Sequence, residues 1–196
     1  MAKALHKNIL KLIQLLVFSG GIWFVNSGNT QVNKSIDEYR FQVALKLFPR
    51  IAATDQQLNE KLSNNGKIWL LIYYTNKPKQ ARQLIEILAD DIPRIGKRDI
   101  EYRYSNKLDE YSGSHQLPTA IFLAEPLNTA DLRKLTEYSQ KYHRLVFSPF
   151  EGDVERGVTA GIYISNKITP YFNKKALIMA DINLHKGLLR VSTQYE

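Results

Sequence analysis

The densest group of side chains suited to chemistry lies in the acidic loop, Phe150–Arg156, near the C-terminus. Glu151, Asp153 and Glu155 alternate there, as oxygen ligands do in some calcium loops. The rest of the calcium-loop pattern is missing, and Arg156 can neutralise one of the carboxylates. The spacing therefore favours a solvated loop with one salt bridge, and we expect no metal ion.

No other part of the chain offers a catalytic set. The histidines beyond the N-terminal segment stand singly, at no spacing typical of a metal site (His115, His143, His185). No serine lies in a nucleophile-elbow pattern. The chain has no cysteine, which excludes disulfides, thiolate metal sites and cysteine nucleophiles. The sequence therefore predicts a protein that is not an enzyme and has no cofactor.

Two tyrosines indicate ligand binding instead. Tyr73 and Tyr74 close the apolar run 68–74, which shows no alternation and so predicts a strand covered on both faces. Ligands of α/β sheets favour the carboxyl ends of such strands, where the two rings can stack a small planar ligand. Because neighbouring strand residues point to opposite faces, we expect at least one of the rings in the core.

The elements that must position these residues alternate between helix and strand. This order predicts an α/β three-layer sandwich around a mostly parallel sheet, with a C-terminal antiparallel edge hairpin. The first expected element is a helix of about 12 to 14 residues that starts from a capping box at Ser35 and ends near Phe48, before Pro49. The others are a short helix over 56–62, strand 68–74, a helix opened by Pro78, strands 100–104 and 119–123, a helix capped by Asn128 or Thr129, strand 144–147, hairpin 162–171 and helix 174–180.

The hairpin carries specific backbone signals. Gly157 and Gly161 predict a tight loop exit and a close backbone approach. Pro170 has no amide to donate, so it predicts that the last strand lies at the sheet edge. Asn173 can cap the helix that follows. Lys174 and Lys175 are unfavourable at the positive end of that helix. The sequence favours a solvated surface pair, with an acidic neighbour or a partner as the alternative.

The first 27 residues have the composition of an export signal. Three lysines precede the apolar run Leu12–Val25, and polar residues follow it. The run is shorter than the about 20 residues that span a membrane. We expect a cleavable signal peptide over 1–27 and a periplasmic protein, with an uncleaved inner-membrane anchor or a buried helix as alternatives. Residues 28–34 are expected to form a flexible lead-in, and 35–196 a single domain.

The composition excludes two further classes. Hydrophobic residues make up 44% and charged residues 23% of the chain, as in folded domains, which excludes global disorder. The net charge is +8, but the basic residues are spread along the sequence rather than clustered. We therefore expect no nucleic-acid partner.

Several segments resemble the YfiR-like family of exported proteins: Tyr39–Pro49, Ala120–Pro126, Phe147–Asp153, Gly157–Ala176 and the tail Ala176–Val191. The likeness rests on apolar framework and glycines rather than on catalytic signatures. It implies a periplasmic α/β domain, often a homodimer, that restrains the periplasmic domain of an inner-membrane diguanylate cyclase and so lowers cyclic di-GMP and biofilm formation. This chain departs from the best-known members in having no cysteine, which leaves no basis for redox control through disulfides.

Two functions of different classes stay open. The first is a non-enzymatic regulator that binds an inner-membrane signalling protein. The alternative is a periplasmic small-molecule-binding protein that serves a transporter or an envelope pathway. A single domain of this length lacks the second lobe of the usual clamshell binder, which favours the regulator. The residues expected to contact a ligand or partner are Tyr73, Tyr74, Phe150, Glu151, Asp153, Glu155 and Arg156.

Overall fold

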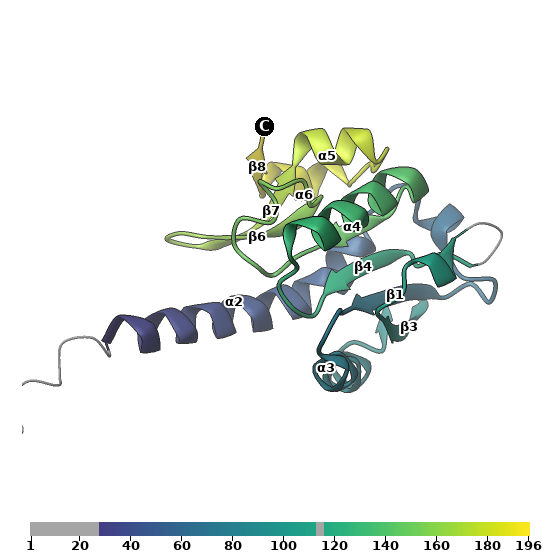
Figure 1. Ribbon diagram of the computed structural model, residues 1–196. Coiled ribbons are helices and arrows are strands. Elements are labelled where there is room, and N and C mark those ends of the chain that lie inside the picture. The colour runs from purple at the N-terminus through teal and green to yellow at the C-terminus, as the bar shows by residue number, and fades with distance from the viewer. Residues whose placement is uncertain (1–27, 113–115) are drawn as a thin grey trace, which may run out of the picture. The chain divides into compact units, whose positions relative to one another are not determined.

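The computed structural model describes residues 28–112 and 116–196 (Figure 1). The predicted signal peptide, residues 1–27, lies outside the described residues. The chain divides into two compact units, Met1–Glu38 and Tyr39–Glu196. The elements, labelled as in Figure 1, are α2 (Gly28–Ala52), η1 (Leu58–Lys61), β1 (Ile68–Tyr73), α3 (Pro78–Asp91), β2 (Arg94–Ile95), β3 (Arg98–Ser105), η2 (Asp109–Tyr111), β4 (Ala120–Leu123), α4 (Thr129–Tyr142), β5 (Leu145–Phe147), β6 (Ala160–Ile164), β7 (Ile168–Asn173), α5 (Lys174–Met179), α6 (Lys186–Arg190) and β8 (Thr193–Tyr195).

The second unit is built on an eight-stranded sheet in the order β2-β3-β1-β4-β5-β6-β7-β8. The strands β3, β1, β4, β5 and β6 run parallel to one another. β2 pairs antiparallel with β3, β7 pairs antiparallel with β6, and β8 pairs parallel with β7. From β1 the chain crosses through α3 to β3 on one side, and from β4 it crosses through α4 to β5 on the other. The strand order therefore reverses between β1 and β4, which is where ligand crevices open in sheets of this class.

Helices cover both faces of this sheet. On one face, Phe48 of α2 and Leu84 and Leu88 of α3 pack against the even-numbered side chains of β1. On the other face, Leu132 and Leu135 of α4 pack against Leu71 and the neighbouring strands. Figure 1 shows α3 and α4 on opposite sides of β1 and β4. The predicted three-layer α/β sandwich is confirmed, and every residue of β1 is buried, as its unbroken apolar run predicts.

The predictions for the N-terminal helix are wrong at both ends. α2 begins at Gly28, so the expected lead-in 28–34 is helical and Ser35 lies inside the helix rather than at a cap. Adding residues to an existing helix needs no new nucleus, so a polar segment can extend one. At the other end α2 continues through Pro49 to Ala52. Pro49 removes one backbone hydrogen-bond donor from the helix. The burial of Ile51 in the last turn offsets this cost. The predicted helix over 56–62 is reduced to the short 3-10 helix η1.

The prediction that Pro170 marks the sheet edge is also wrong. β7 pairs antiparallel with β6 as expected, but β8 adds to its other side and forms the edge. Pro170 lies opposite Ile162 in the ladder with β6 but outside the ladder with β8, which pairs with residues 171–173 of β7, so β8 does not need its missing amide.

The predicted caps of the later helices and the close approach at Gly161 are confirmed. Asn128 and Asn173 each accept a backbone hydrogen bond at the start of α4 and α5. A Cβ on Gly161 would lie 2.8 Å from the Ser148 carbonyl oxygen, so the backbones approach closely there. Lys174 has an acidic neighbour, because its Nζ lies 2.6 Å from a carboxylate oxygen of Glu196. Across the two described ranges, no helix is both long and apolar enough to cross a membrane.

Candidate functional site

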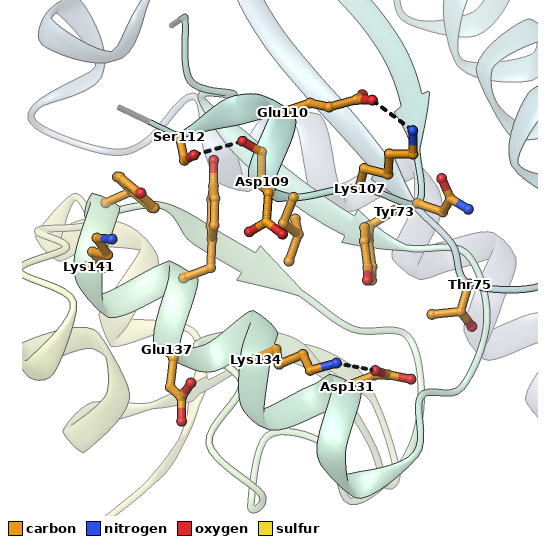
Figure 2. A pocket seen from close by; sticks show the side chains of 14 residues that line it. Tyr73, Thr75, Lys107, Asp109, Glu110, Ser112, Asp131, Lys134, Glu137 and Lys141 are labelled. Carbon is orange, nitrogen blue, oxygen red and sulfur yellow. Dashed lines mark hydrogen bonds and ion pairs between the residues drawn. The ribbon is translucent and has the colours of Figure 1, made fainter. Parts of the chain in front are cut away.

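A cavity of about 580 Å³, called here the β1 cavity, opens beside the carboxyl end of β1. Its floor includes Tyr73, and its two walls are the segment 106–112 after β3 and the side chains of α4 (Figure 2). Its volume is typical of small-molecule sites. The residues that line it are Tyr73, Thr75, Asn106, Lys107, Leu108, Asp109, Glu110, Ser112, Asp131, Lys134, Glu137, Tyr138, Lys141 and Tyr142.

Tyr73 contributes a hydroxyl without a described partner. The residue is 7% exposed, and Figure 2 shows its side chain between the two walls of the cavity. No hydrogen bond joins its hydroxyl to another residue of the described chain. Burial raises the pKa of Tyr73, and the carboxylates of Asp131, Asp109 and Glu125 raise it further. The hydroxyl therefore stays protonated at neutral pH and is available to a ligand.

The inner part of the cavity is aromatic and apolar. The rings of Tyr138 and Tyr142 lie 4.6 Å apart, and Leu108 faces the same space. The Tyr138 hydroxyl donates a 2.6 Å hydrogen bond to the carbonyl oxygen of Tyr111, and burial raises the pKa of Tyr138. That bond fixes the ring and joins the two walls. Rigid rings of this kind offer contact area to a ligand body at little entropic cost.

Charged side chains form the rim. Lys107 pairs with Glu110 at 3.3 Å, and Lys134 pairs with Asp131 at 3.4 Å. Asp109 makes no ion pair with any residue of the described ranges, and Figure 2 shows its carboxylate directed into the cavity. The rim thus has paired charges together with one carboxylate available to a ligand.

Glu125 occupies the crevice between the ends of β1 and β4. Its Oε1 accepts backbone hydrogen bonds from Thr75 (2.6 Å), Asn76 (2.5 Å) and Lys77 (3.1 Å), and the residue is 4% exposed. Burial acts to raise the pKa of Glu125, but these hydrogen bonds outweigh it and hold the pKa below its ordinary value. A buried carboxylate thus fixes the loop that leads into α3 and supports the edge of the β1 cavity.

The acidic loop is internally satisfied. Asp153 is 3% exposed and accepts hydrogen bonds from Ser148 Oγ at 2.6 Å and Arg156 Nη1 at 3.1 Å. Burial raises the pKa of Asp153, and the two donors lower it in part. The predicted salt bridge of Arg156 is confirmed, but the loop is not simply solvated, because its central carboxylate is a buried structural group.

The other acids of the loop also have partners. Glu151 accepts a 2.8 Å hydrogen bond from Arg40, and Glu155 accepts one of 3.0 Å from the Tyr171 hydroxyl. Phe150 packs 6.0 Å from the ring of Phe41. The hollow beside these residues holds about 60 Å³, which is small for an organic ligand. Their role in binding a partner stays a prediction.

The predicted site residues do not form one site. Tyr73 lines the β1 cavity, whereas the ring of Tyr74 lies 6.0 Å from that of Tyr104 and packs against the core cluster of the opposite sheet face. No residue of the acidic loop lines the β1 cavity. Sequence reasoning missed Asp109 and Asp131 altogether. The apolar stripe of α4 did single out Tyr138, but as a core residue, and burial supports that assignment as well. Among the described residues, no group of three or more histidine, aspartate and glutamate side chains is arranged to hold a metal ion.

Comparisons with known proteins leave the family open. No family model matches the chain, and no curated protein matches it. Among solved structures, it is similar to an ABC domain in complex with L-Trp from Streptococcus pneumoniae (13% identity, TM-score 0.42, 74% of this chain and 61% of that one). It is also similar to an open, ligand-free substrate-binding protein with adhesive properties from Clostridium difficile (10%, 0.49, 78% and 58%). A third is a conserved domain protein from Vibrio cholerae (13%, 0.45, 71% and 58%).

The chain spans about three fifths of the length of each of these proteins. All three TM-scores are below 0.5, so the similarities support no argument about site or function.

Proposed function

We propose that this chain is a small-molecule-binding α/β domain and that its ligand occupies the β1 cavity. One observation carries the proposal: the Tyr73 hydroxyl is the polar end of a buried side chain, has no hydrogen-bond partner in the described chain, and borders a cavity of about 580 Å³. A polar group at the floor of a pocket that also offers aromatic and apolar surface fixes the orientation of a bound molecule. The N-terminal pattern of an export signal supports a periplasmic location.

Binding without catalysis fits the lining residues. The described ones include no histidine or cysteine, so no hydroxyl or thiol there has an imidazole base beside it. Tyr73 has a raised pKa, which makes it a weak proton donor and a poor general base at neutral pH. The groups present can hydrogen-bond, stack and pair with charge, and these are the interactions of a binding site.

The test is to identify what the protein carries. The exported protein is purified without denaturation, then unfolded, and the released small molecules are identified by mass spectrometry. Leu108→Trp fills the cavity from its wall, and Leu189→Trp introduces the same side chain at a part-buried leucine of α6, away from the cavity. We expect one compound with the wild type and Leu189→Trp that is missing from Leu108→Trp. An unchanged compound in Leu108→Trp would refute the assignment to this cavity.

A second candidate is the regulator of an inner-membrane diguanylate cyclase that the YfiR-like resemblance implies. It is favoured by apolar side chains that stay exposed on the C-terminal segment, Ile178 (79%), Val191 (64%) and Met179 (51%), since exposed apolar surface commonly marks a protein contact. Deletion of the chain should then raise cyclic di-GMP where a neighbouring gene encodes a cyclase with a periplasmic domain. Unchanged cyclic di-GMP in that strain would refute the regulator.

A further inference from the structure

The β1 cavity differs from the usual crevice of a parallel sheet in its charge. In such sheets, amides at the start of the helix that follows a strand commonly hold an anionic group of the ligand. Here the amides of Thr75, Asn76 and Lys77 all donate to Glu125. These three amides, in the loop just before α3 begins at Pro78, are therefore already occupied by the chain's own carboxylate.

The floor of the cavity lies in a negative field. Asp131, Asp109 and Glu125 all act on the Tyr73 hydroxyl, and each disfavours negative charge there. The same carboxylates favour a positive charge placed beside the hydroxyl. The positive end of the α4 dipole opposes this effect, but Asp131 lies in the first turn of α4 and offsets it.

The lysines of the walls do not reverse this field. The side chains of Lys107 and Lys134 are 68% and 70% exposed, so their ammonium groups lie toward solvent, and each pairs with an acid. Lys141 places its Nζ 5.0 Å from the centre of the Tyr142 ring. The side chain of Asp131 is 27% exposed, so it lies deeper than its lysine partner. The lysine charges are thus exposed to solvent, whereas the carboxylates of Asp131 and Asp109 act on the Tyr73 hydroxyl.

We infer that the ligand of the β1 cavity is an organic cation, an amine with a planar or apolar body; this rests on the proposed binding function. Its ammonium donates to the Tyr73 hydroxyl and pairs with Asp109, while Asp131, which already binds Lys134 and Asn128, adds negative charge nearby. Its planar or apolar body packs against Leu108 and the rings of Tyr138 and Tyr142. The faces of aromatic rings also attract a cation.

The test uses three probes of one shape: phenethylamine, 2-phenylethanol and phenylacetate, which are cationic, neutral and anionic at pH 7. Each is titrated into the whole isotope-labelled protein at low ionic strength and followed by two-dimensional amide NMR. A hydrogen bond to a charged group is worth about 1.5–3 kcal/mol, so we expect phenethylamine to bind at least about tenfold more tightly than phenylacetate, with 2-phenylethanol between them.

Two charge variants accompany the titration. Asp109→Asn removes a cavity carboxylate that has no ion-pair partner in the described chain, so folding should be unaffected; phenethylamine should bind about threefold more weakly. Asp90→Asn, on the exposed side of α3, is the matched control and should leave the affinity unchanged. Equal affinity for the three probes, preference for the acid, or no phenethylamine binding would overturn the inference. If the acid or the alcohol binds more tightly than the amine and Leu108→Trp abolishes that binding, the cation inference is wrong but the proposed small-molecule function stands. If Leu108→Trp carries the same compound as the wild type, the proposed binding function of the β1 cavity is itself refuted.

Discussion

The acidic loop and the β1 cavity both gather carboxylates, but the two regions use them in opposite ways. In the loop, Asp153 is buried and donors of the same segment bind both of its oxygens. In the cavity, Asp109 and the hydroxyl of Tyr73 face open space and have no hydrogen-bonding side-chain partner in the described chain. Concentration of acids in the sequence therefore marks a structural loop here, and unsatisfied polar groups beside a cavity mark the candidate site.

The largest effect is expected in the loop. Asp153→Ala leaves the hydroxyl of Ser148 and the guanidinium of Arg156 without their acceptor, and hydrogen bonds to a charged group are worth about 1.5–3 kcal/mol. The free energy of unfolding should fall by about 2–3 kcal/mol in urea denaturation, while ligand affinity of the native protein stays unchanged. Weaker ligand binding by the folded variant would break the distinction between the two regions.

The second largest loss of stability is expected for a substitution of Glu125. Glu125→Gln keeps the shape of the side chain but replaces a charged acceptor of backbone amides, so we expect unfolding to require about 2 kcal/mol less free energy. Glu86→Gln is the control, because Glu86 forms an exposed pair with Arg82 that is worth at most about 0.5 kcal/mol. Similar losses for the two variants in the same denaturation experiment would show that the buried contacts of Glu125 contribute little.

The two buried carboxylates should give pH dependences of opposite sign. The pKa of Glu125 is lowered from 4.5, so its stabilisation is present above that pH and is lost as the pH falls below it. The pKa of Asp153 is raised from 3.8, so its contribution is full below that pH and declines as the pH rises through the folded-state value. In a pH series of urea denaturation, the deficit of Glu125→Gln should shrink on acidification and that of Asp153→Asn should grow. Parallel trends would contradict these environments.

Two tyrosines of the β1 cavity are expected to differ in role: Tyr138 stabilises the fold, and Tyr73 contacts the ligand. Tyr138→Phe removes a buried hydrogen bond to the Tyr111 carbonyl and should lower the free energy of unfolding by about 1 kcal/mol. Tyr73→Phe removes a hydroxyl without a described partner, so its stability should stay within about 0.5 kcal/mol of the wild type while phenethylamine affinity falls. A stability loss in Tyr73→Phe as large as that in Tyr138→Phe would show that the Tyr73 hydroxyl has a structural role.

The smallest effect is expected at the exposed acid of the loop. Glu151→Ala breaks the pair with Arg40, but the glutamate side chain is 78% exposed, so thermal denaturation should register a loss below about 1 kcal/mol. Binding of phenethylamine should not change. A loss as large as that of Asp153→Ala would mean that the loop depends on its surface pair as much as on its buried carboxylate.

The sequence was most informative where one local rule decides the outcome. The unbroken apolar run gave β1, and single cap residues gave the starts of α4 and α5. The predictions for the end of α2 and for the edge strand failed because contacts distant in sequence determine both. α2 continues past Pro49, where Ile51 is buried, and β7 is not the edge strand because β8 pairs with it. The site was predicted in part. Tyr73 followed from its place at a strand end, whereas Asp109 and Asp131 come from segments that only the crossovers around β1 bring together.

The most direct test of the central claim is where the amide signals move when the wild-type protein is titrated with phenethylamine. If the β1 cavity is the binding site, the largest shifts should lie in residues 73–75, 106–112 and 131–142, and residues 150–156 should stay unchanged. Shifts centred on residues 150–156, with the cavity residues unaffected, would contradict the account.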